Sequence, residues 1–166
     1  MKMTSAEAAK LLRKMNEELD ALCCLEEQSK VFTVSPGEKE EELRPAYDYA
    51  ATRDAMKVLE ARIRQVKHAV NSFNCSTQVP GFDMTIDQML VYLPQLSARK
   101  QKLAAMKNVL PKTRVTRYNS NLVEYNLINY DLAQVAADFE AVSDELAKAQ
   151  NALDIVNTTI TFEVEA

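Results

Sequence analysis

A long stripe of inward-facing positions between residues 49 and 73 constrains the fold of this chain most. Its members recur in alternating steps of three and four residues, which is the spacing of a helix that packs along another helix. The positions are Tyr49, Thr52, Met56, Leu59, Ile63, Val66, Val70 and Phe73. A second stripe with the same spacing comprises Leu132, Val135, Phe139, Val142, Leu146, Ala149, Leu153 and Val156. Two such stripes predict long antiparallel helices that pack together in a bundle.

Helix-start signals add two further helices to these. Thr4 with Glu7 has the spacing of a capping box, and so has Thr85 with Gln88. The sequence therefore predicts about four helices, over roughly 4–28, 46–74, 85–110 and 131–156. Only two glycines occur in the whole chain, and this scarcity also favours long helices over a fold rich in strands.

Pro94 interrupts the third predicted helix. A proline inside a helix removes one backbone hydrogen bond and clashes with the preceding turn. The sequence leaves two possibilities open, a helix that is kinked near Leu90 or a short helix that ends there and is followed by another beginning at Pro94.

Four short segments are rich in β-branched and aromatic residues, which are typical of strands. They are residues 31–34, 112–118, 122–128 and 158–164. A lone hairpin is marginally stable in water, whereas three or four strands can form a small sheet. We therefore expect residues 1–166 to form a single helical-bundle domain, mainly α with a small β component, in which these segments make a small antiparallel sheet at one end.

The composition bounds the class of protein. With 47% hydrophobic and 27% charged residues, the chain resembles an ordinary globular protein. The net charge of −4 does not require a nucleic acid or an anionic membrane as partner. The chain has no apolar run near the ~20 residues that span a bilayer, and its start lacks the apolar segment of a signal peptide. We expect a cytoplasmic protein that does not associate with membranes.

The residues that most often carry catalysis or bind metals are few. Cys23, Cys24 and Cys75 lack the Cys-x-x-Cys spacing of a redox or metal site, so we interpret them as reduced thiols. His68 is the only histidine and falls off the apolar stripe, which favours a surface position. The sequence contains no phosphate-binding loop, no nucleophile elbow and no Glu-x-x-His pair. We therefore predict no catalytic residues, no metal ligands and no cofactor.

Acidic residues leave one enzymatic alternative open. A helical nucleotide phosphohydrolase holds Mg²⁺ with carboxylates at helical spacing, and both Glu17 with Asp20 and Glu38 with Glu41 have such a spacing. The second pair belongs to an acidic run at residues 38–42, which directly follows a proline and a glycine. We interpret that run as a solvated surface in a loop or at the entrance of a helix.

A basic segment is the sharpest charge feature. Between Gln88 and Val123 the chain has no aspartate or glutamate. The same stretch carries seven positive side chains, Arg99, Lys100, Lys102, Lys107, Lys112, Arg114 and Arg117. These residues are our candidates for an anion-binding site or an interface. One interpretation pairs them with acidic residues of the same molecule or of another subunit, such as residues 38–42 or Asp138, Glu140, Asp144 and Glu145.

The other interpretation is a surface for anions or nucleic acid. Lysine and arginine would then bind phosphates, and Tyr118 or Tyr125 would stack on bases. This alternative is possible but not favoured, and it predicts binding that weakens with salt.

The order of elements resembles a family of small bacterial proteins, some described as septicolysin-like, whose biochemical role is not established. The similar segments are Arg62-Ile63-Arg64-Gln65-Val66, Asn71-Ser72-Phe73-Asn74, Met84-Thr85-Ile86-Asp87, Leu96-Ser97-Ala98-Arg99-Lys100 and Leu153-Asp154-Ile155-Val156-Asn157-Thr158. They span most of the chain but are permissive matches. The chain departs from the family at Pro94 and has no tryptophan after Asn157. The resemblance implies no catalytic residues.

These observations favour a non-enzymatic structural or protein-interaction module. The two apolar stripes predict self-association through helix surfaces or exposed strand edges, so we expect a homo-oligomer and allow for another protein partner. The alternatives are the anion or nucleic-acid binder and, less favoured, the metal-dependent nucleotide phosphohydrolase.

Overall fold

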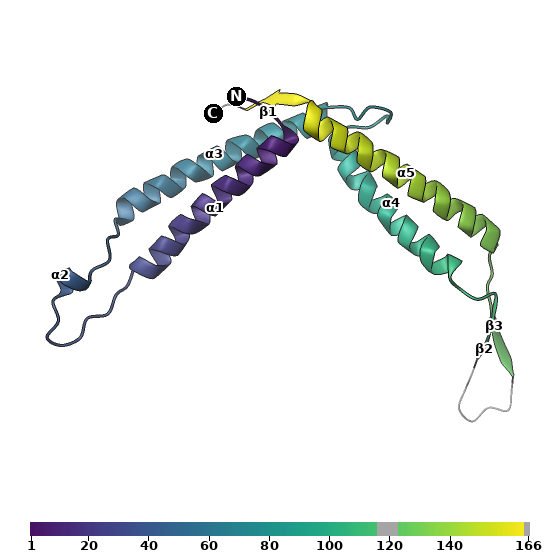
Figure 1. Ribbon diagram of the computed structural model, residues 1–166, viewed down its shortest axis with the longest axis horizontal. Coiled ribbons are helices and arrows are strands. Elements are labelled where there is room, and N and C mark those ends of the chain that lie inside the picture. Colours follow the sequence, from purple (N-terminus) through teal and green to yellow (C-terminus); the bar gives the residue numbers. More distant parts are fainter. Residues whose placement is uncertain (116–122, 165–166) are drawn as a thin grey trace. The chain divides into compact units, whose positions relative to one another are not determined.

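The computed structural model describes residues 1–115 and 123–164. These residues form five helices and four strands, in the order β1 (Lys2–Thr4), α1 (Ser5–Ser29), α2 (Glu40–Leu43), α3 (Tyr49–Ser76), α4 (Ile86–Lys107), β2 (Lys112–Val115), β3 (Glu124–Leu127), α5 (Leu132–Thr159) and β4 (Thr161–Glu163) (Figure 1). The protein is mainly α with a small β component, which confirms the predicted fold class.

The chain divides into two compact units, each built around a pair of long helices. One unit comprises Met1–Thr77 with Ile155–Ala166, and the other comprises Gln78–Asp154. The first contains α1 and α3, and the second contains α4 and most of α5. The predicted helices are therefore present, but they are grouped as two pairs where we expected one bundle. Each apolar stripe has its partner in a helix that is close in the sequence.

The helices begin where the sequence predicts caps. The Thr4 hydroxyl accepts a hydrogen bond from the Glu7 N–H at 3.2 Å, and the Glu7 carboxylate accepts one from the Thr4 N–H at 2.8 Å. The bond from the Thr4 N–H, and a second one that the Thr4 hydroxyl donates at 3.1 Å, stabilise the charged carboxylate, so the pKa of Glu7 lies below its ordinary value. Asp48 caps α3 by accepting from the Ala51 N–H at 3.1 Å.

The core of the first unit lies between α1 and α3, which run side by side in opposite directions (Figure 1). Its buried members are Met3, Ala8, Met15, Leu59, Ile63, Val66 and Val164. The strands β1 and β4 pair antiparallel next to it, with Met3 opposite Phe162. The ring of Phe162 stacks on that of Phe73 with the centroids 4.6 Å apart. Both chain ends and both long helices thus share one core.

The core of the second unit lies along α4 and α5. Its buried side chains include Val79, Ile86, Met89, Leu96, Val135, Val142, Leu146, Ala149 and Leu153. Helix α4 continues through Pro94 without a break, so the alternative of two short helices is wrong. The capping box at Thr85 and Gln88 is present and sets the start of this helix.

The strand predictions need three corrections. Residues 31–34 form no strand, and Val31 is 75% exposed, because this short run has no neighbouring strand to pair with. The expected single sheet is two separate two-stranded sheets, β1 with β4 and β2 with β3. The strand β1 was not predicted, because a segment of three residues has too little pattern to be read from the sequence. Residues 116–118 and 122 lie outside the described residues.

Candidate functional site

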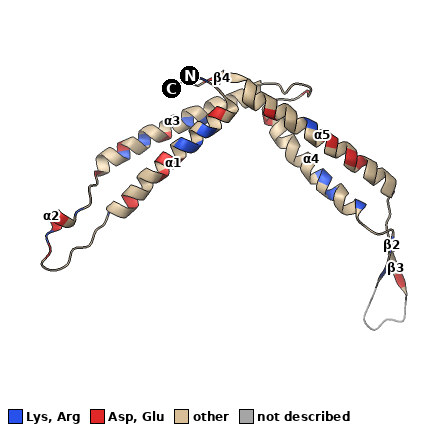
Figure 2. Ribbon diagram, viewed as in Figure 1, with Lys and Arg blue, Asp and Glu red and all other residues tan. Residues whose placement is uncertain are grey.

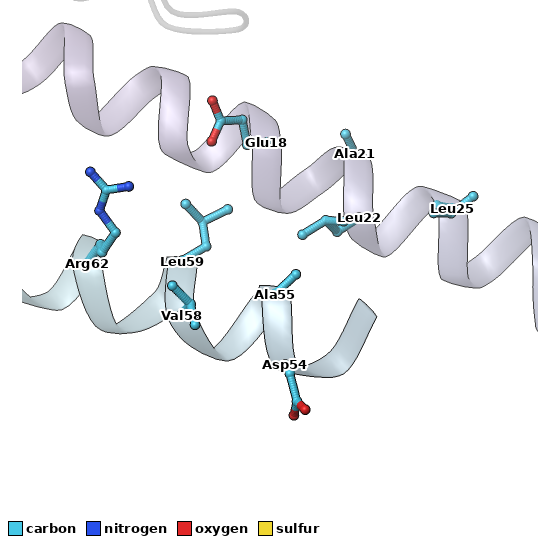
Figure 3. A pocket seen from close by; sticks show the side chains of 9 residues that line it. All are labelled: Glu18, Ala21, Leu22, Leu25, Asp54, Ala55, Val58, Leu59 and Arg62. Carbon is cyan, nitrogen blue, oxygen red and sulfur yellow. The ribbon is translucent and has the colours of Figure 1, made fainter. Parts of the chain in front are cut away.

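An apolar groove runs between α1 and α3 and has a volume of about 800 Å³ (Figure 3). Helix α1 lines it with Ala21, Leu22 and Leu25, and helix α3 lines it with Ala55, Val58 and Leu59. Glu18, Asp54 and Arg62 supply the charged part of its lining. Most of its lining is apolar and it is larger than the grooves on the α4/α5 pair and beside the hairpin, which makes this groove the strongest candidate for a binding surface.

The apolar side chains of the groove are exposed beyond what a helix pair can cover. Val58 is 63% exposed and Leu25 is 42% exposed. At the start of α3, Tyr49 is 60% exposed. Two packed helices bury only the seam between them, so a third or fourth helix is needed to cover the flanks. Contiguous exposed apolar side chains of this kind mark interaction surfaces.

The two flanks of α3 differ in chemistry. The flank that faces the groove carries Ala55, Val58 and Arg62. The positions away from the seam on the opposite flank are occupied by exposed charged residues, namely Arg53, Lys57, Glu60, Arg64 and Lys67. The flank that faces the groove thus combines apolar side chains with Asp54 and Arg62, whereas the opposite flank is charged throughout.

The predicted basic residues are distributed over two elements. Arg99, Lys100, Lys102 and Lys107 lie on α4, and Lys112 and Arg114 lie on β2. Arg117 lies outside the described residues. In the ribbon of Figure 2, the positions of Lys and Arg along α4 are blue and the positions of Asp and Glu along α5 are red.

Part of this positive charge is used within the α4/α5 pair. The ammonium of Lys107 lies 3.4 Å from a carboxylate oxygen of Glu140 and 4.7 Å from the centre of the Phe139 ring. The ammonium of Lys100 lies 5.8 Å from the same ring centre. Cations attract both carboxylates and the faces of aromatic rings, so these contacts hold α4 against α5. Glu140 is one of the acidic partners that the sequence suggested.

Polar hydrogen bonds also join α4 to α5 and to the segment before α5. The Tyr92 hydroxyl donates a hydrogen bond to the carboxylate of Glu145. Because the neutral phenol is the donor, this bond raises the pKa of Tyr92, and burial raises it further. The Tyr130 hydroxyl donates to the carbonyl oxygen of Met106 at 2.8 Å, which fixes the segment before α5 to α4.

A second groove lies on the α4/α5 pair and has a volume of about 450 Å³. Arg99 and Lys102 line it from α4, and Asp138 lines it from α5. The rest of its lining is apolar and includes Leu103 and Val135. Two cations and one carboxylate leave a positive balance here, so this groove is the part of the predicted basic segment that is best placed to receive an anion.

The hairpin of β2 and β3 carries the remaining basic residues. The ammonium of Lys112 lies 4.0 Å from the centre of the Tyr125 ring on the opposite strand. Leu127 is 68% exposed and Leu110, just before β2, is 65% exposed. Both line a further groove of about 430 Å³. Tyr125, which we considered as a base-stacking residue, is therefore engaged by a lysine of its own hairpin.

The described residues show little that supports chemistry. They contain no group of three or more His, Cys, Asp and Glu side chains that converge as metal ligands. His68 is exposed, and Cys23, Cys24 and Cys75 are exposed free thiols. Within the ranges 1–115 and 123–164, no helix is long and apolar enough to cross a membrane.

Comparison with known proteins adds the fold alone. No protein-family model matches the chain, and no curated protein matches it. Among solved structures, it is similar to the crystal structure of a functionally unknown conserved protein from Corynebacterium diphtheriae, with a TM-score of 0.62 and 16% sequence identity. The match covers 98% of this chain and 100% of that one. The two proteins share an architecture over their full lengths.

Proposed function

We propose that this protein is a non-enzymatic structural or protein-interaction module that self-associates through the groove between α1 and α3. The observation that carries the proposal is the exposed apolar lining of that groove, in which Val58 is 63% exposed. On the second long helix pair, the groove lined by Arg99, Lys102 and Asp138 is smaller, about 450 Å³, and has a positive balance of charge.

The energetics favour a contact made by several side chains at once. Full burial of one valine or leucine contributes about 1.5–3 kcal/mol. Association itself costs about 4–15 kcal/mol in lost translational and rotational freedom. One exposed valine is therefore insufficient, whereas covering Val58, Leu25 and the half-buried Leu22 on each of two copies adds several partial contributions.

The test is the molar mass of the purified protein in solution. Size-exclusion chromatography with light scattering is run at low and at high salt. An integer multiple of 18.7 kDa under both conditions is expected, because apolar contacts are not screened by ions. A monomer under both conditions contradicts the proposal.

The second candidate function is an anion or nucleic-acid binder that uses the basic segment. It is supported by Arg99 and Lys102, which line one groove and have no ion-pair partner among the described residues. Replacement of Arg114 and Arg117 by glutamate is then expected to abolish oligonucleotide binding, and absence of binding at low salt contradicts this candidate. Mg²⁺-dependent turnover of nucleotides would instead support the phosphohydrolase, for which the described carboxylates form no cluster.

A further inference from the structure

We infer that the occupant of the α1/α3 groove is a second copy of this chain, packed antiparallel about a two-fold axis at Val58. In this arrangement Arg62 of each protomer lies against Asp54 of the partner subunit. The inference rests on the proposed function and specifies its partner and geometry.

The spacing of three residues on α3 points to this axis. Asp54, Val58 and Arg62 follow one another at intervals of four residues, and all three line the groove. Four residues of helix correspond to a rise of ~6 Å, so the two charges lie at about equal distances on either side of Val58. A two-fold axis perpendicular to the helix at Val58 places each position 62 over position 54 of the other copy.

The charges are complementary only in the antiparallel arrangement. There, each guanidinium meets a carboxylate, and Val58 meets Val58 of the partner subunit at the axis. A parallel arrangement of the two α3 helices in register places Asp54 against Asp54 and Arg62 against Arg62, which is repulsive. The groove therefore carries both the carboxylate and the guanidinium that the contact requires, so the grooves of two copies are complementary to each other.

Neither charged group is held in a buried ion pair within the described residues. Arg62 has no ion-pair partner in the described part of the chain, although Glu18 shares its end of the groove (Figure 3). Asp54 accepts from Arg53 at 2.9 Å and lies 3.9 Å from Lys57, but all three side chains are exposed. Exposed pairs within one helix are weak, and a carboxylate has about four acceptor positions, so Asp54 can accept a further arginine.

The apolar part of the lining agrees with this arrangement. Ala55 and Ala21, which line the groove (Figure 3), are small and let helices approach closely. Val58 and Leu25 are larger and exposed, so they are available to fill the space between two facing grooves. When two such grooves face each other, the two helix pairs pack as two layers of a four-helix bundle. This packing buries the flanks that each pair leaves exposed.

Charge reversal tests the inference directly. The variants Asp54→Arg and Arg62→Asp each place like charges at both contacts and are expected to weaken dimerisation at least tenfold, measured by sedimentation equilibrium. The double variant Asp54→Arg/Arg62→Asp restores opposite charges at both contacts and is expected to return the dissociation constant to within about threefold of the original. The matched control is Glu60→Arg/Arg64→Glu and its single variants, which change the opposite flank and are expected to have no effect.

The outcomes separate this inference from the proposed function. A dimer that is unaffected by both single reversals, or that the double variant does not recover, overturns the two-fold geometry but leaves self-association standing. A monomeric original protein overturns both. If a variant is poorly folded by circular dichroism, Val58→Cys in a protein whose three cysteines are replaced by serine supplies a second measurement. Rapid disulfide crosslinking of two chains is expected at this axis position, and its absence in a dimer overturns the inference.

Discussion

The two long helix pairs of this protein are held together in different ways. The α4/α5 pair has polar contacts between its helices in addition to a buried core, such as Lys107 with Glu140 and Tyr92 with Glu145. In the α1/α3 pair, no ion pair joins the two helices within the described residues, and one flank is an apolar groove. The comparison shows that helix pairs of similar length can differ in what their flanks require. Charged flanks are suited to water, whereas an apolar flank gains free energy when it is covered.

The largest effect is expected in the core of the α4/α5 pair. Leu96 is 0% exposed, so Leu96→Ala leaves a cavity and is expected to lower the free energy of unfolding by about 2–5 kcal/mol. Chemical denaturation measures this change. The control is Val91→Ala on the same helix, where 59% exposure predicts little effect. Equal losses in the two variants would show that α4 is not buried as described.

The next largest effect is expected on self-association, and it distinguishes the two helix pairs. Val58→Asp puts a charge into the apolar groove and is expected to convert the oligomer to a monomer of unchanged helicity, because an unpaired carboxylate cannot be buried cheaply. Light scattering gives the mass. Val91→Asp is the matched control, since Val91 on α4 has nearly the same exposure, 59% against 63%. Dissociation by Val91→Asp, with no change in Val58→Asp, would move the interface to the α4/α5 pair.

The elements were predictable from the sequence, but their grouping was not. The stripes of α3 and α5 and the capping boxes at Thr4 and Thr85 are local patterns, so they predict helices directly. Which stripe packs against which depends on connections and on side chains far apart in the sequence. For the same reason the strand β1 was missed, since Lys2 pairs with Glu163 at the other end of the chain.

The candidate site was predicted only in part. The basic segment stood out because it lacks acidic residues, and the structure places its Lys107 beside Glu140, as the first interpretation suggested. The groove was not predicted, because the apolar stripe of α3 identifies the buried seam and gives no information on the flank beside it. The sequence did contain a signal. Ala55 and Val58 are small or apolar although they lie beside the buried seam, whereas the corresponding positions on the opposite flank of α3 carry charges.

A smaller effect tests the polar contacts of the α4/α5 pair. Lys107→Ala removes the contact with Glu140 and with the Phe139 ring and is expected to lower the free energy of unfolding by ~0.5–1 kcal/mol, less at high salt. The control is Lys14→Ala in α1, whose ion pair stays within one helix, with Glu18 at 3.9 Å. A loss in Lys14→Ala as large as in Lys107→Ala, measured by denaturation at two salt concentrations, contradicts the difference between the two pairs.

The smallest effect is a change of pH dependence in the segment that leads into α3. The Tyr47 hydroxyl donates a hydrogen bond to the Glu26 carboxylate of α1 at 2.7 Å, which raises the pKa of Tyr47 from 10.0 to about 12. Because the pKa is raised in the folded protein, the contact contributes fully below pH 10 and is lost as the pH rises towards 12. Titration of tyrosinate absorbance, with Tyr47→Phe to identify the signal, measures this pKa.

Glu26→Ala removes the acceptor of that hydrogen bond, so the pKa of Tyr47 is expected to fall back towards 10.0. An unchanged pKa in this variant would mean that another group holds the phenol. The Tyr47–Glu26 bond links the segment before α3 to α1. Its loss at high pH is therefore expected to loosen the end of the pair nearest Leu25 and to weaken self-association there.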